Sequence, residues 1–524
     1  MKKLLSLVLA LVMLLGIAAI DVQAEEEPMV IEWAGGHDTD AIAENDTVKA
    51  WLEEKFNVKL NVWFLERGSY KELLTARIAG GEIPDVFWVD STALFIELVK
   101  QGVCLELPLE TVEELMPESY AWLKEFDPNC FDLVSYGGKN YGLPRVNLDG
   151  KYSYAPFWRA DWLKQLGYED GEVPRTIDEF EEAFYYFAKN DPDGNGIDDT
   201  YGLSNTGFMP IFGAFGALPD AFNPLRSSHW IVNEEGNLEY GSVYAGMKDA
   251  LELLAKWYAD GVIDPEFITG ENQGQHWCLS IPFQEGKIGF SSSGAFYQIE
   301  PDFDGPKNEE TGEGGSFQLG KAVRNLSFPY EDVVIGWNPI GPDGKSGGEN
   351  WGTTTAEAVC FSKNLADDPD KLAKICEIIN TIESDFDVYK RIYNWDLNDD
   401  AWKYDPMLGF LTEPGYTRAD ESAHSNMFDT LQNPYFRMKV TPARYNWANS
   451  VPQFSAPGYP NKLLITPASA ADTWAAMYTY VSGAYAEFIR GEKSLDDWDD
   501  FVAQWYAMGG EAITEEANEW YHSR

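Results

Sequence analysis

The chain has 524 residues, 44% of them hydrophobic, which is enough to bury large cores in two to four compact units. Its 86 acidic and 39 basic side chains give a formal net charge of −47 at pH 7. A surface of this sign repels nucleic-acid phosphates and anionic membranes, so we expect no nucleic-acid partner.

The N-terminal segment, residues 1–24, has the pattern of a secretory signal peptide. Lys2 and Lys3 precede an apolar run from Leu4 to Ile20, and the tripeptide VQA completes the segment. Its removal takes away a net charge of +1 and leaves −48. The sequence has no second apolar run of about 18 residues or more. We therefore expect a secreted protein that is extracellular or associated with the cell envelope, without a lipid anchor, since no cysteine lies near the cleavage site.

Residues 28–90 alternate between apolar runs and helical patterns, an order that predicts a parallel sheet covered by helices. The apolar runs are residues 29–33, 58–65 and 85–89, and the helical patterns are residues 45–56 and 68–79. Ligands of such sheets bind at the carboxyl ends of the strands. Because Trp33, Trp88 and Asp90 fall at two of the predicted strand ends, we expect them to contact a ligand.

Residues 173–203 combine a capped helix with an acidic loop. Thr176 and Glu179 form a capping box, and apolar residues then recur at helical spacing as far as Phe187. The loop that follows reads KNDPDGNGIDDTYG, and its oxygen-bearing residues are spaced as in an EF-hand-type calcium loop. This spacing predicts a structural calcium site.

The predicted calcium ligands occupy positions one, three, five, seven and nine of the loop, with glycine at position six. They are Asp191, Asp193, Asn195, the Ile197 carbonyl and Asp199. Position twelve, normally a bidentate glutamate, is Gly202, so a further oxygen must come from Thr200, water or a distant carboxylate. An acidic turn without metal is the alternative, because Asp, Asn and Gly are also common turn residues.

Four segments carry a family resemblance: 81–90 (GEIPDVFWVD), 157–167 (FWRADWLKQLG), 173–203 with its helix and acidic loop, and 488–510 (FIRGEKSLDDWDDFVAQWYAMGG). In their order and spacing the chain resembles the extracellular solute-binding protein family 1, the sugar-binding receptors of ABC importers. The resemblance implies an α/β, periplasmic-binding-protein-like fold of two lobes, which close on a ligand about a hinge of crossing strands. Members often carry an acidic residue where this loop has Thr200, and many Gram-positive members are lipoproteins.

On this basis we expect the chain to pass between the lobes more than once, so that each lobe contains separate segments of the sequence. Lobe 1 should contain residues 28–148 and about 353–380, and lobe 2 should contain residues 152–335 and much of about 400–524. The hinge crossings are expected near residues 148–152 and 335–352. We expect the protein to be a monomer.

A sugar presents apolar C–H faces and hydroxyl groups, so its receptor needs aromatic plates together with carboxylates, amides or guanidinium groups. The chain supplies 19 tryptophans and 27 tyrosines, aromatic residues that also carry a polar group. Beyond the strand ends, the candidates lie beside the expected crossings or in irregular stretches: Trp158, Arg159, Trp351, Arg444, Tyr445 and Trp447. For Trp158 and Arg159, the family resemblance also implies ligand contacts.

These features predict a non-catalytic receptor that captures an oligosaccharide and passes it to the permease subunits of an ABC importer. The motif HExxH is absent, and among 86 acidic residues a pair at glycosidase spacing carries no information. The alternatives are a peptide-binding receptor, a secreted glycan-active hydrolase and an adhesin. The net charge favours a neutral sugar over a uronate, unless Arg159 or Arg444 supplies a local positive charge.

Overall fold

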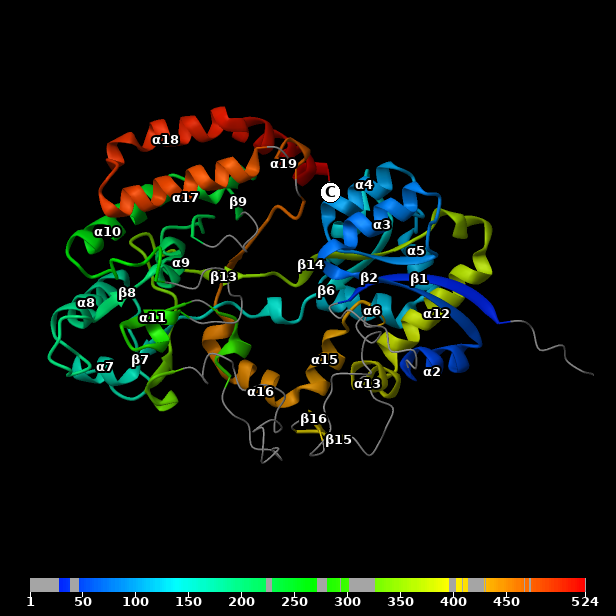
Figure 1. The fold of residues 1–524 in the computed structure, drawn as a ribbon, viewed down its shortest axis with the longest axis horizontal. Coiled ribbons are helices and arrows are strands. Elements are labelled where there is room, and N and C mark those ends of the chain that lie inside the picture. Colours follow the sequence, from blue (N-terminus) through cyan, green and yellow to red (C-terminus); the bar gives the residue numbers. More distant parts are fainter. Residues whose placement is uncertain are drawn as a thin grey trace, which may run out of the picture.

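The computed structural model describes most of the chain beyond the expected signal peptide, and residues 1–24 lie outside the described part. The described residues are 28–37, 47–222, 229–270, 280–292, 294–300, 326–394, 402–407, 409–412, 428, 430–465, 467–470 and 473–523. They form two α/β lobes that lie side by side and are joined by several passages of the chain (Figure 1). None of the helices within these ranges is both long enough and apolar enough to cross a membrane.

The first lobe is built on a five-stranded sheet with the order β2-β1-β3-β14-β6. Its strands are β1 (Met29–His37), β2 (Val58–Glu66), β3 (Val86–Val89), β6 (Gly142–Val146) and β14 (Thr354–Phe361). β1 pairs in parallel with β2 and with β3, which confirms the predicted alternation of strands and helices at the start of the chain. β14 returns from the second lobe and pairs antiparallel with β3 and β6.

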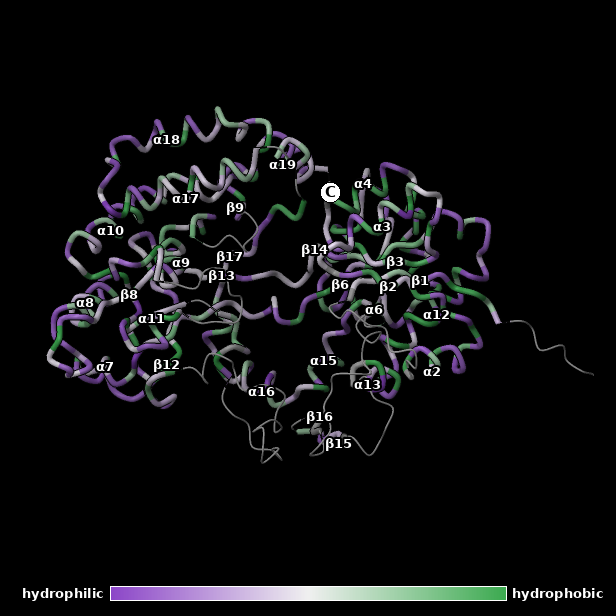
Figure 2. Tube along the Cα trace, in the orientation of Figure 1, coloured by the Kyte–Doolittle hydropathy of each residue, from purple (hydrophilic) through white to green (hydrophobic). Residues whose placement is uncertain are grey.

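Helices pack on this sheet and bury their apolar faces in a common core. They are α2 (Thr47–Phe56), α3 (Tyr70–Ala79), α4 (Thr92–Lys100), α5 (Leu109–Leu115), α6 (Pro117–Phe126), α12 (Pro369–Ser384), α13 (Phe386–Asn394) and α15 (Pro434–Val440). Two hairpins complete the lobe: β4 (Ser135–Tyr136) with β5 (Lys139–Asn140), and β15 (Trp402–Asp405) with β16 (Gly409–Thr412). The core includes residues as far along the chain as Val440, well past the return segment expected at 353–380. In Figure 2, hydrophobic residues gather on the strands of this sheet.

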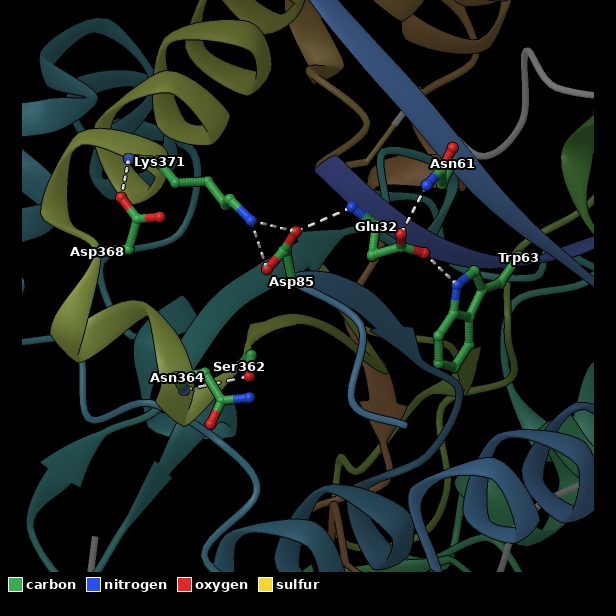
Figure 3. A network of polar contacts seen from close by, with 8 residues as sticks. All are labelled: Glu32, Asn61, Trp63, Asp85, Ser362, Asn364, Asp368 and Lys371. Atoms are coloured by element: carbon green, nitrogen blue, oxygen red, sulfur yellow. Dashed lines mark hydrogen bonds and ion pairs between the residues drawn. The ribbon is translucent and has the colours of Figure 1, made fainter. Parts of the chain in front are cut away.

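A polar network ties the sheet of the first lobe to α12 (Figure 3). The Asp85 carboxylate accepts a hydrogen bond from the Glu32 backbone N–H at 2.9 Å and lies 3.2 Å from Lys371 Nζ. Glu32 accepts hydrogen bonds from Asn61 Nδ2 and Trp63 Nε1, each at 2.7 Å. The network therefore links β1, β2, the residue before β3 and the first turn of α12.

Replacement of Asp85 by alanine is expected to lower the free energy of unfolding by about 2–3 kcal/mol, the scale of a lost charge-assisted hydrogen bond in a buried setting. The change leaves the Lys371 ammonium without its carboxylate, and Asp85 is only 9% exposed. Urea unfolding measures the loss. Asp367→Ala, an exposed position just before α12, is the control and should change stability by less than about 0.5 kcal/mol. Equal effects of the two substitutions would contradict the role assigned to Asp85.

The second lobe has a four-stranded sheet with the order β12-β7-β11-β8. Its strands are β7 (Phe157–Arg159), β8 (Tyr201–Leu203), β11 (Ile288–Ser291) and β12 (Val333–Ile335), and β9 (Trp230–Val232) pairs with β10 (Leu238–Tyr240) beside it. Its helices are α7 (Ala160–Gln165), α8 (Ile177–Lys189), α9 (Phe208–Gly213), α10 (Gly246–Ala259), α11 (Ile281–Gln284), α17 (Trp474–Arg490), α18 (Trp498–Trp505) and α19 (Glu511–Ser523).

Helix α8 begins as the sequence predicts. Thr176 Oγ1 accepts a hydrogen bond from the Glu179 N–H, and the Glu179 carboxylate accepts one from the Thr176 N–H at 3.0 Å. The apolar face of the helix, including Phe180, Phe184 and Phe187, is fully buried in the core of the second lobe. The capping box therefore fixes the start of the helix that carries the chain into the acidic loop.

Three crossings join the lobes: residues 147–156, 336–353 and 441–462. The second contains β13 (Gly348–Asn350), and the third contains α16 (Pro442–Ser450) and β17 (Gly458–Pro460), which pairs in parallel with β13. The third crossing was not anticipated from the sequence. It arises because α15 packs in the first lobe whereas α17 packs in the second.

Backbone hydrogen bonds hold the crossings against one another. The Tyr154 N–H donates to the Glu349 carbonyl at 2.8 Å, and the Ser153 N–H donates to the Phe454 carbonyl at 2.9 Å. Gly150 lies so close to the second crossing that a Cβ atom there would overlap the carbonyl oxygen of Gly352. Only glycine fits at this contact, so the backbones of the first two crossings can pack directly against each other.

Candidate functional site

Aromatic and charged side chains from all three crossings gather at one place, together with residues 296–300 of the second lobe. We call this set the crossing cluster; it consists of Asp149, Tyr152, Tyr154, Tyr297, Glu300, Trp351, Arg444 and Tyr445. The Trp351 ring lies 5.6 Å from the Tyr154 ring and 6.5 Å from the Tyr297 ring, measured between centroids. Trp351 is 37% exposed, which makes it one of the more exposed large hydrophobic side chains among the described residues. An exposed indole flanked by two tyrosines is the arrangement that the C–H face of a sugar requires.

The polar part of the crossing cluster is an ion pair and a tyrosine–carboxylate bond. Arg444 Nε and Nη2 donate to the two oxygens of Glu300 at 2.8 and 2.7 Å, a bidentate geometry. The Arg444 guanidinium also lies 5.7 Å from the centre of the Tyr297 ring. Tyr445 Oη donates to Asp149 Oδ1 at 2.9 Å. These contacts position the aromatic rings that surround Trp351.

Burial controls the ionisation of this cluster. It raises the pKa of Glu300, although the bond to Arg444 acts in the opposite direction. Burial, with the nearby Asp149 carboxylate, raises the pKa of Tyr152 to about 12. Burial and Asp149 also hold the pKa of Tyr445 well above its usual value. Tyr152 and Tyr445 therefore stay protonated at neutral pH and remain hydrogen-bond donors.

Trp158 does not belong to the crossing cluster. It is 0% exposed, and its ring packs among Phe180, Phe184 and Phe290 at centroid distances of 4.7, 5.4 and 4.5 Å. β7, the strand that carries it, pairs on both sides with β11 and β12, so one face of the strand points into the core of the second lobe. A side chain enclosed in this way offers no face to a ligand, and the sequence-based expectation for Trp158 is corrected accordingly.

Arg159 is also held internally. Its guanidinium donates to both carboxylate oxygens of Asp161, at 2.8 and 2.5 Å, and lies over the rings of Trp162 and Phe328 at 4.5 and 4.0 Å. It is 6% exposed. These contacts account for the side chain as a connection between β7 and α7, whereas the sequence analysis had assigned it to the ligand.

The candidates at the edge of the first lobe lie apart from one another. β1 extends to His37, so Trp33 lies within the strand and not at its end; it is buried against Phe428 at a centroid distance of 5.2 Å. Trp88 is partly exposed, and its ring lies 4.9 Å from that of Tyr70. Asp90 accepts a hydrogen bond from Ser91 Oγ at 3.1 Å. Only Trp88 and Asp90 keep the partial exposure at the strand end that a ligand contact requires.

In the third crossing, the expected site residues Arg444, Tyr445 and Trp447 lie on α16, although the sequence suggested an irregular stretch. Arg444 and Tyr445 join the crossing cluster, whereas Trp447 packs edge-on against Phe454 at 5.3 Å. Tyr445 is buried and contributes through its hydroxyl group.

Five members of the cluster were not among the site residues expected from the sequence. Asp149, Tyr152 and Tyr154 lie in the tyrosine-rich stretch DGKYSYAPFW, where the density of aromatic residues beside an expected crossing was a usable signal. Tyr297 and Glu300 lie on and just after a short helical turn, and no local pattern marks them. Tertiary packing alone brings them to Trp351 and Arg444.

The acidic loop between α8 and β8 is turned tightly on itself. The Asp191 carboxylate accepts a hydrogen bond from the Gly196 N–H at 2.9 Å, and Gly194 and Gly196 adopt positive φ angles of 71° and 82°. Thr200 Oγ1 donates to the Phe187 carbonyl at 2.8 Å, which anchors the end of the loop to α8. Thr200 is thus engaged with the helix, and its hydroxyl is turned away from the loop centre.

Two features of this loop fit a hard cation. Asp191 Oδ1 is buried and has no hydrogen-bond partner within the described residues. Asn195 Nδ2 donates to Asp193 Oδ2 at 2.8 Å and to Asp199 Oδ1 at 3.1 Å, so an amide group stands between carboxylates that a cation would neutralise. Within the described ranges, this loop included, no group of three or more His, Cys, Asp or Glu side chains is already arranged to hold a metal. The residues present therefore suit calcium, but their side chains are not gathered around a common point.

Two pockets lie on the second lobe, outside the crossing cluster. One, of about 300 Å³, lies between α7 and β12, and the other, of about 380 Å³, lies beside the acidic loop near Tyr201 and Tyr258. Both lack the exposed indole that distinguishes the crossing cluster.

Two α/β lobes joined by crossings, with aromatic and hydrogen-bonding side chains gathered at those crossings, define the architecture of a two-lobed binding protein. The chain belongs to the family of bacterial extracellular solute-binding proteins, whose family model matches residues 37–367. This confirms the resemblance and the fold class predicted from the sequence. The family and the fold are those of non-catalytic solute-binding proteins.

Comparison with known proteins gives two distant relatives, of which one spans most of the chain. It is 24% identical over 503 residues to the lipoprotein LipO of Bacillus subtilis, covering 90% of this chain and 88% of the relative. It is 23% identical over 241 residues to the polygalacturonan/rhamnogalacturonan-binding protein YtcQ of the same organism, covering 45% and 44%. Among solved structures, it is similar to an EF-hand mutant of the S. pneumoniae ABC-transporter substrate-binding protein FusA in complex with fructo-nystose. That match has a TM-score of 0.57 and 17% identity, and it covers 94% of this chain and 99% of the other.

Proposed function

We propose that this protein captures an oligosaccharide outside the cell and delivers it, chemically unchanged, to the permease subunits of an ABC importer. The observation that carries the proposal is the exposed Trp351 at the crossings, flanked by Tyr154 and Tyr297. Membership of the solute-binding family supports it, as do relatives whose names refer to glycan polymers and a fructo-oligosaccharide. Trp88 and Asp90 on the first lobe would reach the same ligand when the lobes close about the crossings.

A panel experiment tests this proposal. Isothermal titration calorimetry with neutral, acidic and amino oligosaccharides should give tight binding for one class, and chromatography should recover that sugar intact. Recovery of cleaved sugar would show a hydrolase instead. Tight binding of extended peptides, with no binding of any glycan, would show a peptide receptor.

Replacement of Trp351 by alanine is expected to weaken binding of the cognate glycan by about 1–3 kcal/mol, the scale of a lost aromatic stacking contact. The melting temperature should change little, because the side chain is 37% exposed before ligand binds. Tyr136→Ala is the matched control, since Tyr136 is 38% exposed and lies on a hairpin of the first lobe. Unchanged affinity in the Trp351 variant would remove the crossing cluster from the site.

We further propose that the acidic loop binds one structural calcium ion through Asp191, Asp193, Asn195, the Ile197 carbonyl and Asp199. Two observations support this assignment: the buried Asp191 Oδ1, which has no hydrogen-bond partner among the described residues, and the Asn195 amide placed between two carboxylates. Binding would turn the Asn195 amide so that its oxygen faces the ion. Calcium supplies a charge that neutralises the carboxylates, and the loop thereby fixes the end of α8 to the start of β8.

The place of action that we propose is the outer side of the cell envelope. The N-terminal pattern of residues 1–24 and the extracellular family support export. The relative LipO is named as a lipoprotein, which fits a place of action at the cell envelope. We propose that the receptor works as a monomer.

A further inference from the structure

We infer that the crossing cluster selects uncharged oligosaccharides and rejects those that contain uronate residues. This inference rests on the proposed function, and it concerns the charge of the ligand that the same site admits. It follows from the carboxylates with which the positively charged side chains near the crossings are paired.

Three guanidinium groups at or beside the crossings are each paired with a carboxylate of the protein. Arg444 is held by Glu300 in a bidentate pair, and Glu300 is only 1% exposed. Arg159 is held by both oxygens of Asp161. Arg145, at the end of the first lobe next to the first crossing, lies 2.6 Å from Glu357. Because bidentate guanidinium pairs are a strong means of binding a carboxylate, the pair with Glu300 occupies the one guanidinium of the crossing cluster.

The lysines of the crossings do not replace these guanidinium groups. Lys345 donates to Tyr244 Oη at 2.9 Å, a residue of the second lobe. Lys151 and Lys462 are exposed, and an exposed ammonium group contributes little to an ion pair because water screens it.

The carboxylates of the cluster outnumber its cations. The cluster contains two carboxylates, Asp149 and Glu300, and one guanidinium, that of Arg444, which leaves one net negative charge. The Asp149 carboxylate is close enough to contribute to the raised pKa values of Tyr152, Tyr297 and Tyr445. A uronate bound over Trp351 would therefore meet a like charge, whereas a neutral sugar would not.

The relative YtcQ is named for polygalacturonan, which is an acidic polymer, so the inference assigns this chain a ligand of a different charge class.

Oligosaccharides that differ only at C6, with a CH₂OH group in one and a carboxylate in the other, provide the test. Suitable pairs are mannotetraose with tetramannuronate and galactotetraose with tetragalacturonate. Calorimetry on the full secreted chain, with calcium present, measures each affinity at low and high salt.

In every pair that binds, the neutral sugar is expected to bind at least tenfold more tightly than the acidic one. The difference should increase at low salt, where repulsion is least screened. An acidic sugar that binds as tightly as its neutral counterpart would overturn the inference and leave the proposed function standing. Failure of every glycan to bind the folded protein would overturn both.

A charge-changing variant tests the mechanism. Glu300→Gln removes the charge that neutralises Arg444, so the affinity ratio of acidic to neutral sugar should rise at least tenfold. Glu181→Gln is the matched control, because Glu181 pairs with Lys256 at 2.8 Å within the second lobe and should leave the ratio unchanged. Asp149→Asn, which removes the other carboxylate, should raise the ratio in the same direction if the Glu300 variant does not fold. An unchanged ratio in the folded variant would contradict the inference.

Discussion

Replacement of Trp158 by alanine is expected to lower the free energy of unfolding by about 3–5 kcal/mol, the range for deleting a large aromatic side chain from a packed core. The indole is 0% exposed and packs against the rings of Phe180, Phe184 and Phe290. Its removal therefore leaves a cavity among these rings. Thermal and urea unfolding measure the loss.

Trp158→Phe is the conservative companion and should recover most of this stability, because a phenyl ring fills much of the same space. Glycan affinity, measured below the lowered melting temperature, should remain close to that of the unchanged protein. Trp351→Ala should show the reverse pattern, with lost affinity and retained stability. A Trp158→Ala protein that is stable but no longer binds sugar would restore Trp158 to the binding site.

Removal of calcium with EGTA is expected to lower the melting temperature, and added calcium should restore it. At a free calcium concentration one hundred times the dissociation constant, binding to the folded state alone contributes about 2.7 kcal/mol. Differential scanning calorimetry measures the shift, and elemental analysis of the purified protein measures the bound metal.

Substitutions of two neighbouring aspartates distinguish the loss of a calcium ligand from the loss of a negative charge. Asp199→Asn should reduce the response to calcium, since Asp199 occupies a predicted ligand position, whereas Asp198→Asn should preserve it. Both substitutions remove one negative charge from the same exposed stretch. An unchanged melting curve after EGTA, together with no metal by elemental analysis, would exclude the site.

The calcium response should also depend on pH. Partial desolvation, followed by the neighbouring Asp191 and Asp199, raises the pKa of Asp193 in the metal-free loop. Around that raised pKa the folded chain binds more protons than the unfolded chain, so the metal-free protein loses stability as pH rises through this range. Calcium binds the ionised carboxylates and therefore gains affinity over the same range. The increase in melting temperature caused by calcium is expected to grow between about pH 4 and pH 7.

The sequence by itself determined the features that depend on neighbours along the chain. The alternation of apolar runs and helical patterns in residues 28–90 led to β1, α2, β2, α3 and β3, because strand and helix periodicity are local properties. Thr176 and Glu179 marked the start of α8 through a capping box that needs only four consecutive residues. The spacing of Asp191 to Asp199 marked the acidic loop for the same reason.

Only the tertiary structure decided which aromatic residues lie in a core and which face the crossings. Trp158 and Trp351 look alike in the sequence, but β7 is the inner strand of a sheet, whereas Trp351 follows β13 on a crossing between lobes. Arg444 meets Glu300 across 144 positions of the chain, and Asp149 meets Tyr445 across 296. Such partners are set by how the lobes pack, and no local pattern of charge or hydrophobicity encodes that packing.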